Sequence, residues 1–580
     1  MRHRLARRLT VGLTAMSVGA VGAVVGALAA APPAIAENNG LSLTPAMGWS
    51  SWSFVRRDPT EANIEAQADA MRDSGLSAHG FVYINLDDFY LKCDANGPVV
   101  DANGRWTVDT AKFPNGMKAV ADHVHADGLK FGLYVTPGVP QNAVTKNTPI
   151  LGSSAHAADI ADTSRTEKNY NCKHMYYIDY SKSGAQQYVD SFADLFASWG
   201  VDYLKIDGVG ADDIPDVQAW STALRQTGRP INFALSNNLP IANAATWQQY
   251  ANSWRTQGDV ECYCGPGANG SGYPLTDWSH VSARFSTAAS WQPYAGPGGW
   301  NDLDSIEIGN GDQVGLSADQ RRSQLTLWSM AAAPLLLGTD LTHLDSTDLA
   351  MLTNDRVLGV DQDAVAAKRI VNSGSQQVFS KRESSGAYVV ALFNTGTSGN
   401  QTVTANWSQV GFTGTGDVTD LWSGSHTGTV ANSYSATLRP GETRLIRVVP
   451  GAGGGSASVE AEASGNTLSG ATAVASCSTC SGGAKVRFIG NNSANYETVN
   501  NVSTGTAGSK TLTITYELDG SRSFFVSVNG GAGVEVPVTG TSWSTPATRT
   551  LTVNLTAGGN TIKLYNNGAY APDLDKISVS

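Results

Sequence analysis

The sequence is constrained most by one recurring unit, a short apolar run that ends in polar residues. About eight such runs occur between residues 41 and 365. They lie at residues 46–49, 81–86, 131–135, 203–206, 231–235, 253–255, 299–301 and 334–337. Helical patterns separate several of them, for example residues 61–72, which follow Thr60 as an N-cap. Alternating strands and helices predict an α/β fold with a parallel sheet, and about eight units predict a (β/α)8 barrel over residues 41–365.

An open, doubly wound parallel sheet would account for the same alternation. That fold often carries a Gly-rich phosphate loop after its first strand, and none follows residues 46–49. In a barrel, the active site collects at the carboxyl ends of the strands. The polar residues of this chain follow its apolar runs at those ends, so the barrel is the favoured fold.

The run from Tyr203 to Asp207 has the most informative end. Alternate side chains of a strand share a face, so Lys205 and Asp207 point to the same side, away from Ile206. A cation close to a carboxylate favours its ionised form. Asp207 is therefore predicted to be a positioned anionic nucleophile or base, with a structural ion pair at the strand end as the alternative.

Length, charge and the N-terminal pattern limit the class of protein. A chain of 580 residues predicts roughly two to four domains. Charged residues make up 15% of it and the net charge is −11, which disfavours nucleic acid as a partner. Residues 1–36 form a predicted signal peptide, with a basic start, an apolar run and Ala34-Ile35-Ala36 as the cleavage pattern. We expect a secreted, extracellular protein without membrane contact, and a membrane anchor is the alternative.

The six cysteines favour disulfides over a zinc site in an exported protein. Cys477 and Cys480 are close enough in sequence to pair within one loop. The other four lie in predicted barrel loops and allow three pairings. They are Cys93, Cys172, Cys262 and Cys264. None of the nine histidines has ligand spacing to these cysteines, which argues against zinc.

Strand patterns replace the helical period after about residue 365. Residues 366–450 are predicted to form an antiparallel β-sandwich domain. Residues 451–456, Gly-Ala-Gly-Gly-Gly-Ser, are typical of a flexible linker. Residues 457–580 contain strand patterns at 510–516 and 522–528 and are predicted to form a second β-sandwich, of the jelly-roll type.

Five motifs occur in order along the barrel region. They are Ala46-Met47-Gly48-Trp49-Ser50-Ser51-Trp52, Tyr83-Ile84-Asn85-Leu86-Asp87-Asp88, Leu204-Lys205-Ile206-Asp207-Gly208, Trp254-Arg255-Thr256-Gln257-Gly258-Asp259 and Gly298-Gly299-Trp300-Asn301-Asp302-Leu303-Asp304. Together they resemble α-galactosidases of glycoside hydrolase family 27, and the resemblance covers roughly residues 41–450. Residues 457–580 resemble a family 35 carbohydrate-binding module, which opens with Val459-Glu460-Ala461-Glu462 and closes with Pro572-Asp573-Leu574-Asp575.

The first resemblance implies a secreted retaining exo-glycosidase that removes terminal α-D-galactosyl residues from oligosaccharides and polysaccharides. It implies Asp207 as the nucleophile and Asp259 as the general acid and base, a role for which Asp259 needs a raised pKa. The implied substrate-binding residues are Trp49, Asp87, Asp88, Tyr134, Lys205, Asn238 and Arg255. Asp302 and Asp304 are expected to be loop scaffold. The resemblance implies no cofactor for catalysis.

Two departures from the family pattern bear on the sugar. Phe89-Tyr90 follows the aspartate pair where the family usually has Cys-Trp. Asn237-Asn238 stands where Cys-Glu-Trp or a close variant is usual, so the residue expected at the 2-hydroxyl is Asn238, neutral rather than acidic. Other sugar specificities therefore stay open, because the family includes β-L-arabinopyranosidases and isomalto-dextranases.

Two other classes of protein are alternatives to a glycosidase. A sugar-binding protein without turnover would have lost Asp207 or Asp259, and both are present. A metal-dependent hydrolase in the same barrel would carry histidine clusters at the strand ends, which are lacking here. The second resemblance adds a structural calcium ion, because three carboxylates would repel one another unless a hard cation joined them. The predicted ligands are Glu460, Glu462 and Asp575.

Overall fold

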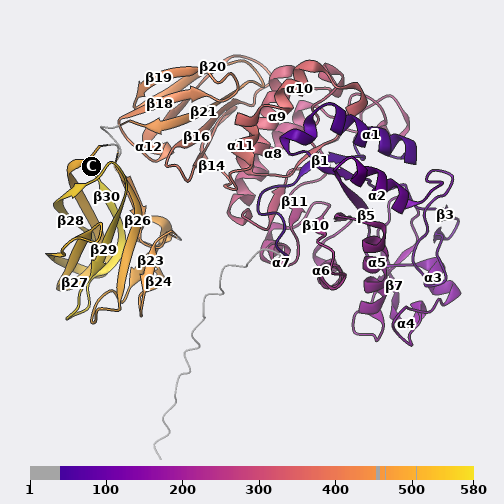
Figure 1. The fold of residues 1–580 in the computed structure, drawn as a ribbon, viewed down its shortest axis with the longest axis horizontal. Helices are drawn as coiled ribbons and strands as arrows, with labels where there is room; N and C mark the ends of the chain where they lie inside the picture. Colours follow the sequence, from indigo (N-terminus) through magenta and orange to yellow (C-terminus); the bar gives the residue numbers. More distant parts are fainter. Residues whose placement is uncertain (1–38, 452–456, 464, 505) are drawn as a thin grey trace, which may run out of the picture.

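The computed structural model describes residues 39–580 except 452–456, 464 and 505. The predicted signal peptide lies outside the described residues, and so does most of the predicted linker. Figure 1 shows three bodies along the chain: an α/β barrel, an antiparallel β domain beside it, and a β-sandwich at the C-terminal end. None of the described helices is long and apolar enough to cross a membrane.

Eight parallel strands form the barrel sheet, which confirms the predicted fold class. In spatial order they are β12 (Trp300–Asp302), β11 (Ser253–Arg255), β10 (Asn232–Leu235), β9 (Tyr203–Ile206), β5 (Lys130–Val135), β2 (Tyr83–Asn85), β1 (Met47–Ser50) and β13 (Leu335–Leu337). The two ends of the sheet meet where Ile306 forms a parallel bridge with Leu337. Each strand overlaps one of the apolar runs of the sequence.

Helices surround this sheet, and sequence caps set where the clearest of them begin. Thr60 and Asn63 form a capping box at α1, and Ser317 and Gln320 form one at α9. The helices between and after the strands are α1 (Glu61–Asp73), α2 (Met117–Ala126), α3 (Gln141–Lys146), α4 (Ala157–Ile160), α5 (Ala185–Trp199), α6 (Ile214–Gln226), α7 (Ala244–Tyr250), α8 (Trp278–Trp291), α9 (Ala318–Ala331), α10 (Ser346–Leu352) and α11 (Asp355–Asp361). Their buried faces pack on the sheet in one large hydrophobic core.

The second body has a six-stranded and a two-stranded antiparallel sheet, with the short helix α12 (Trp407–Val410). The strands are β14 (Lys368–Ser373), β15 (Gln376–Arg382), β16 (Tyr388–Asn394), β21 (Thr443–Pro450), β18 (Thr415–Asp420) and β19 (His426–Ala431) in the first sheet, and β17 (Gln401–Asn406) and β20 (Ser433–Leu438) in the second. Phe285 of α8 contacts Phe379 and Phe393, with ring centroids 6.1 and 4.8 Å apart. The barrel and this domain therefore share one core.

The C-terminal sandwich has a hydrophobic core of its own. Its strands are β22 (Ala457–Glu460), β23 (Thr467–Ser469), β24 (Ala473–Ser476), β25 (Ala484–Arg487), β26 (Tyr496–Thr504), β27 (Gly508–Val528), β28 (Val534–Leu555), β29 (Gly558–Tyr565) and β30 (Asp573–Val579). The first and last of them, β22 and β30, pair antiparallel. The two strands predicted at 510–516 and 522–528 form one long strand, β27, whose pairing with β28 shifts register after Glu517.

Disulfides close three loops, and they select one of the pairings that the sequence left open. Cys93 is bonded to Cys172, and Cys262 to Cys264. Cys477 and Cys480 are bonded to each other, as predicted. The first bridge joins two small loop sheets of the barrel. One sheet pairs β3 (Cys93–Asp94) with β4 (Gly97–Pro98). The other contains β6 (Val139–Pro140), β8 (Met175–Ile178) and β7 (Ala161–Glu167), and Cys172 lies between β7 and β8 in the chain.

Candidate active site

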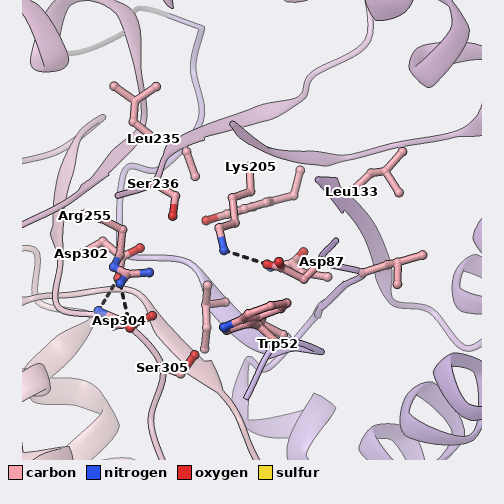
Figure 2. A pocket seen from close by; sticks show the side chains of 16 residues that line it. Trp52, Asp87, Leu133, Lys205, Leu235, Ser236, Arg255, Asp302, Asp304 and Ser305 are labelled. Carbon is pink, nitrogen blue, oxygen red and sulfur yellow. Dashed lines mark hydrogen bonds and ion pairs between the residues drawn. The ribbon is translucent and has the colours of Figure 1, made fainter. Parts of the chain in front are cut away.

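A pocket lies at the carboxyl ends of the barrel strands (Figure 2). Its charged and hydroxyl groups come from strand ends and the loops after them, and they include Asp87, Lys205, Ser236, Arg255, Asp302 and Asp304. Trp52, which follows β1, supplies an aromatic face. Charged hydrogen-bonding groups beside an aromatic face suit a polyhydroxylated ligand.

Lys205 is a fixed cation in this pocket. Its Nζ lies 2.7 Å from Oδ2 of Asp87 and 5.6 Å from the ring centroid of Tyr134, its neighbour in the register of β5 and β9. Burial alone would lower the pKa of Lys205, but the carboxylates of Asp87 and Asp207 raise the pKa above its ordinary value. The ammonium group thus lies between two acids, and its hydrogen bond goes to Asp87.

Asp87 and Asp88 follow β2 and are almost fully buried. Oδ1 of Asp87 accepts from the amide of Asp88 at 2.9 Å, and Oδ1 of Asp88 accepts from the amide of Phe89 at 2.7 Å. Burial raises the pKa of both carboxyl groups, to about 7 for Asp88. Oδ2 of Asp88 is buried and has no hydrogen-bond partner in the described part of the chain. Asp88 therefore keeps one acceptor that the protein itself does not use.

Asp207 comes directly after β9 and is half-buried. Its amide donates to the carbonyl oxygen of Val135 at 2.8 Å, which ties it to the end of β5. Its Oδ2 accepts a hydrogen bond from the hydroxyl group of Tyr134 at 3.2 Å. One carboxylate oxygen is thus held in place by a neighbouring strand.

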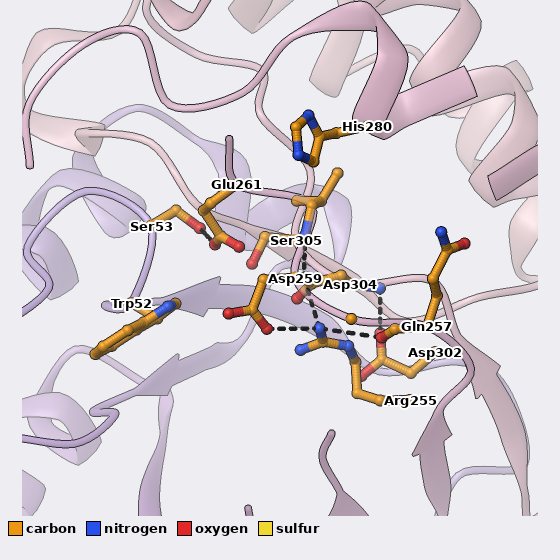
Figure 3. A network of polar contacts seen from close by, with 12 residues as sticks. Trp52, Ser53, Arg255, Gln257, Asp259, Glu261, His280, Asp302, Asp304 and Ser305 are labelled. Carbon is orange, nitrogen blue, oxygen red and sulfur yellow. Dashed lines mark hydrogen bonds and ion pairs between the residues drawn. The ribbon is translucent and has the colours of Figure 1, made fainter. Parts of the chain in front are cut away.

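Asp259 lies in the loop after β11, and a network of charged groups fixes it (Figure 3). Arg255 lies 2.9 Å from Oδ1 of Asp259 and 2.8 Å from Oδ2 of Asp304. Asp304 also accepts from the amide of Val260 at 2.7 Å, while the hydroxyl group of Tyr263 donates to Oδ2 of Asp259. Asp304 therefore acts as the loop scaffold that the sequence predicted, and it also lines the pocket.

The pKa of Asp259 differs from the expectation. Burial raises it, but Arg255 and the hydrogen bond from Tyr263 outweigh burial, so the pKa lies below its ordinary value. The predicted raised pKa is therefore wrong for the free protein. The physical reason is the guanidinium group of Arg255, which stabilises the carboxylate anion.

Tyr170 is close to both Asp207 and Asp259. Burial raises the pKa of this phenol, and the charges of the two carboxylates raise it further. The two acids follow β9 and β11, which only β10 separates in the sheet. Neither acid is among the residues that line the pocket, whereas Lys205 and Arg255, which precede them by two and four residues, are. The charges of both carboxylates thus act on one phenol near the pocket.

One predicted substrate contact is wrong. Trp49 is fully buried in the hydrophobic core, and its Nε1 donates to the carbonyl oxygen of Thr339 at 2.7 Å. Because side chains alternate along a strand, Ser50 of β1 lines the pocket and Trp49 points to the opposite face of the sheet. The tryptophan that lines the pocket is Trp52, beyond the end of the strand.

Asn238, expected at the 2-hydroxyl of a sugar, is exposed in the loop after β10 and is not a lining residue of the pocket. Ser236, at the end of that strand, does line it. Sequence reasoning also passed over Tyr170 and Tyr263, whose side chains meet the two acids. The signal for Tyr263 was its place between Cys262 and Cys264, directly after the Asp259 motif.

Metal-ligand geometry occurs at one place in this site. Ligand oxygens of Asp259, Glu261 and Asp304 lie within 4.8 Å of one another. Arg255 contacts two of these three carboxylates, so a cation from the protein already offsets part of their charge. The group holds no histidine, unlike a typical catalytic zinc site.

The three acids predicted as calcium ligands gather around Ser481 and Gly482 in the C-terminal sandwich. The Ser481 hydroxyl donates to Glu460 at 2.7 Å and to Asp575 at 3.1 Å. A Cβ atom added at Gly482 would lie 2.2 Å from Oε1 of Glu462, so that carboxylate is adjacent. In the described chain the three do not form a group with all ligand oxygens within 4.8 Å, so a bound ion would have to draw their side chains together.

A fourth acid, Glu497, lies beside this cluster. It is fully buried, and neither of its carboxylate oxygens has a hydrogen-bond partner among the residues that the structure describes. Burial and the charge of Glu462 raise the pKa of Glu497 well above its ordinary value. Oxygen-rich acid clusters of this kind fit a hard divalent cation.

Comparisons with known proteins agree with the fold. The family model described as alpha galactosidase A matches residues 44–148 and 175–363, and the one described as alpha galactosidase C-terminal beta sandwich domain matches residues 373–448. Alpha-galactosidase 2 of Arabidopsis thaliana is 33% identical over 413 residues, which cover 70% of this chain and 89% of that protein. The alpha-galactosidase of Cyamopsis tetragonoloba is 33% identical over 420 residues, with 71% and 88% covered.

Solved structures give the same class of fold. A β-L-arabinopyranosidase of glycoside hydrolase family 27 from Geobacillus stearothermophilus superposes with a TM-score of 0.64 at 29% identity and covers 71% of this chain and 98% of its own. Alpha-galactosidase I of Mortierella vinacea superposes with a TM-score of 0.57 at 27% identity, with 71% and 98% covered.

The barrel with acids at its strand ends and an attached β-sandwich defines a glycoside hydrolase of the α-galactosidase type. The chain belongs to glycoside hydrolase family 27, whose enzymes need no cofactor for catalysis. The two family models end at residue 448, so the resemblance of residues 457–580 to a family 35 carbohydrate-binding module stays a prediction.

Proposed function

We propose that this enzyme is a retaining exo-glycosidase that releases terminal α-D-galactosyl residues. In the first step the carboxylate of Asp207 attacks the anomeric carbon, the bond to the leaving oxygen breaks, and Asp259 gives that oxygen its proton. In the second step Asp259 takes a proton from water, the water oxygen bonds to the anomeric carbon, and Asp207 leaves as a carboxylate. Two inversions return the α-anomer.

The observation that carries the proposal is the pair of carboxylates beside one pocket. Tyr134 of β5 holds one oxygen of Asp207, and Arg255 of β11 holds one oxygen of Asp259. A retaining glycosidase needs one carboxylate to attack and a second to protonate, on opposite sides of the anomeric centre. The proposal assigns these two positions to Asp207, directly after β9, and Asp259, in the loop after β11.

In this proposal the sugar hydroxyl groups donate to the aspartate pair. Asp87 shares its charge with Lys205, and the unused Oδ2 of Asp88 accepts a hydroxyl group. Lys205 and Arg255 bind further hydroxyl oxygens as donors. For the 2-hydroxyl we keep Asn238 as a candidate and add Ser236, because Ser236 lines the pocket. The face of Trp52 replaces Trp49 as the apolar wall.

The lowered pKa of Asp259 gives the proposal a distinct pH dependence. Since Arg255 and Tyr263 favour the anion, the protonated form of Asp259 in the free enzyme is present mainly at acid pH. We therefore expect kcat/KM for substrates with poor leaving groups to fall as the pH rises through the pKa of Asp259.

A second candidate is hydrolysis of β-L-arabinopyranosides by the same steps. The structural likeness to the Geobacillus stearothermophilus β-L-arabinopyranosidase, with a TM-score of 0.64, favours testing it. L-Arabinopyranose lacks the hydroxymethyl group of galactose, so the two sugars differ at one substituent. Isomalto-dextranase activity stays a further alternative, and a sugar-binding protein without turnover is the least favoured.

We also propose secretion, with residues 1–36 removed, and a role for residues 457–580 in binding galactose-containing polysaccharide. Glu460, Glu462 and Asp575 are the proposed ligands of a structural calcium ion, and the buried Glu497 beside them supports that proposal. Calcium would offset the mutual repulsion of these acids and fix the joined ends of β22 and β30. It would take no part in hydrolysis.

The test combines a substrate panel with a variant. Release of nitrophenol is measured from aryl α-D-galactoside, β-L-arabinopyranoside and α-D-glucoside, with and without chelator. We expect the galactoside to give the highest kcat/KM, unchanged by chelator. Asp207→Ala should lose turnover, and azide should restore part of it and yield a β-glycosyl azide. A first-formed β-anomer from the native enzyme would mean inversion and refute the two-step mechanism.

A further inference from the structure

Tyr263 is held in an unusual conformation directly after the Asp259 motif. It lies between Cys262 and Cys264, which are bonded to each other, and its φ of 50° is in the left-handed region that bulky residues rarely adopt. Such backbone positions persist only where the surroundings fix them, and they cluster at functional sites. The conformation of Tyr263 therefore needs support from its neighbours.

Two neighbours give that support. A Cβ atom added at Gly270 would lie 2.2 Å from the carbonyl group of Tyr263, so only glycine allows this approach. The guanidinium group of Arg56 lies over the phenol ring, 4.7 Å from its centroid, in cation–π contact. The disulfide holds the backbone on both sides, Gly270 packs against it, and Arg56 holds the ring.

The hydroxyl group of Tyr263 joins two residues of the active site. It accepts a hydrogen bond from Nε1 of Trp52 at 2.9 Å and donates one to Oδ2 of Asp259. Arg255 contacts the other oxygen of the same carboxylate. In Figure 3 the Asp259 carboxylate lies between Trp52 and Arg255. Each oxygen of Asp259 thus has one donor, a charged one from β11 and a neutral one from the disulfide loop.

We propose that Tyr263 is a positioning residue of the reaction, and that the disulfide between Cys262 and Cys264 holds its hydroxyl group against Asp259. This inference rests on the proposed role of Asp259 as acid and base. The hydrogen bond fixes the carboxyl group beside Trp52, and it stabilises the anion that remains after the proton has gone to the leaving group. The phenol stays neutral, because burial and the nearby carboxylates raise its pKa.

Tyr263 differs from the other groups that act on Asp259. Charged or ionisable side chains face this carboxylate from several elements, namely Lys205, Arg255, Glu261, Arg284, Asp304 and Tyr170. Among the donors to its oxygens, Arg255 carries a full charge and also binds Asp304. Removal of the Tyr263 hydroxyl therefore removes the hydrogen bonds to Asp259 and from Trp52 without changing the net charge of the site.

The first test is Tyr263→Phe, which keeps the ring over Arg56. The pH dependence of kcat/KM is measured on the aryl glycoside with the poorest leaving group that the enzyme cleaves. Without the hydrogen bond the anion is less stable, the pKa of Asp259 rises, and the acid form persists to higher pH. We expect the alkaline limb of the profile to move up by about one to two pH units. In the Cys262→Ser/Cys264→Ser double variant the alkaline limb should move in the same direction.

Tyr273→Phe is the matched control, because Tyr273 lies in the same loop and its hydroxyl group donates to Asn310 at 2.8 Å. Its profile should equal that of the native enzyme. An alkaline limb that does not move in Tyr263→Phe overturns the inference, and so does an equal shift in Tyr273→Phe. If the Cys262→Ser/Cys264→Ser variant folds and its alkaline limb does not move, the proposed role of the disulfide is refuted.

The role of Asp259 is tested apart from Tyr263. Asp259→Ala should impair substrates with poor leaving groups far more than activated ones. Equal losses for both kinds of substrate would refute the proposed function, whereas selective losses together with an unmoved limb in Tyr263→Phe would refute this inference alone. Adding Tyr263→Phe to Asp259→Ala should cause no further change in the pH profile, since the titrating group is already gone.

Discussion

Replacing Asp88 with asparagine is expected to stabilise the folded barrel at alkaline pH and to weaken catalysis. Asp88 is almost fully buried, and one of its carboxylate oxygens has no partner in the described chain. Such a group costs stability when it is charged. In the proposed function the same group accepts a hydrogen bond from a sugar hydroxyl. The unpaired buried acid therefore lowers the stability of the fold but contributes to substrate binding.

The magnitude follows from the pKa. Burial is the main reason that the pKa of Asp88 rises from 3.8 to about 7. The folded enzyme keeps a proton that the unfolded chain has released, so the native protein loses stability as the pH rises between these values. A difference of about three units corresponds to roughly 4 kcal/mol, at about 1.36 kcal/mol per unit. Asparagine cannot ionise, so the variant avoids this loss.

The assay is urea unfolding of the full chain at pH 5 and at pH 8.5, followed by the fluorescence of the buried tryptophans. Between these two pH values the gain of Asp88→Asn over the native enzyme should grow by about 3 kcal/mol. The matched control is Asp58→Asn, which changes an exposed acid of the same domain. At pH 8.5, where Asp88 is ionised, kcat/KM of the variant should also be about 10- to 100-fold below that of the native enzyme, the value of one hydrogen bond to a charged group.

Two results would refute this reasoning separately. A gain that is the same at both pH values, or that equals the gain of Asp58→Asn, would mean that Asp88 does not titrate as its burial implies. An unchanged kcat/KM would remove Asp88 from sugar binding, whatever its effect on stability.

Two more predictions concern the pocket wall and the C-terminal sandwich. Trp52→Ala should lower kcat/KM at least about tenfold, because stacking and the hydrogen bond to Tyr263 are lost. Trp49→Phe changes the core, so it should lower the unfolding midpoint and leave KM unchanged. A KM raised only in the Trp49 variant would reverse the assignment. Chelator should lower the melting temperature of the C-terminal sandwich and not that of the barrel, and Glu462→Gln should remove this sensitivity; a sandwich that melts alike with chelator and with calcium would refute the calcium site.

The barrel could be predicted from the sequence because each strand is an apolar run followed directly by polar residues. An apolar run followed by a polar residue marks both a buried strand and the mouth of the barrel, as Ile206 and Asp207 do. This change from apolar to polar residues is less clear in the first motif, which contains Trp49 and Trp52. Trp49 and Trp52 lie on opposite sides of the end of β1, and the sequence does not show where that strand stops. The wrong tryptophan was therefore placed in the pocket.

Two separate strands were predicted in the C-terminal sandwich, at residues 510–516 and 522–528. Asp519-Gly520-Ser521, which lies between them, has the composition of a turn. In the structure β27 continues through these residues, because β28 pairs with them and shifts register after Glu517. A long partner strand supplies hydrogen bonds to both sides of the segment, so tertiary pairing outweighs the local preference.

The positions of the charged residues could be predicted from the sequence, but the residues with which they pair could not. Lys205 was expected to serve Asp207, two residues along the strand, yet its hydrogen bond goes to Asp87, 118 residues earlier in the chain. Arg255 likewise binds both Asp259 and Asp304. The raised pKa of Asp259 was expected from its role as the acid, without these partners. A motif fixes which acids reach the mouth of a barrel, but the loops decide which cations and hydroxyl groups meet them, and those contacts set the pKa values on which the chemistry depends.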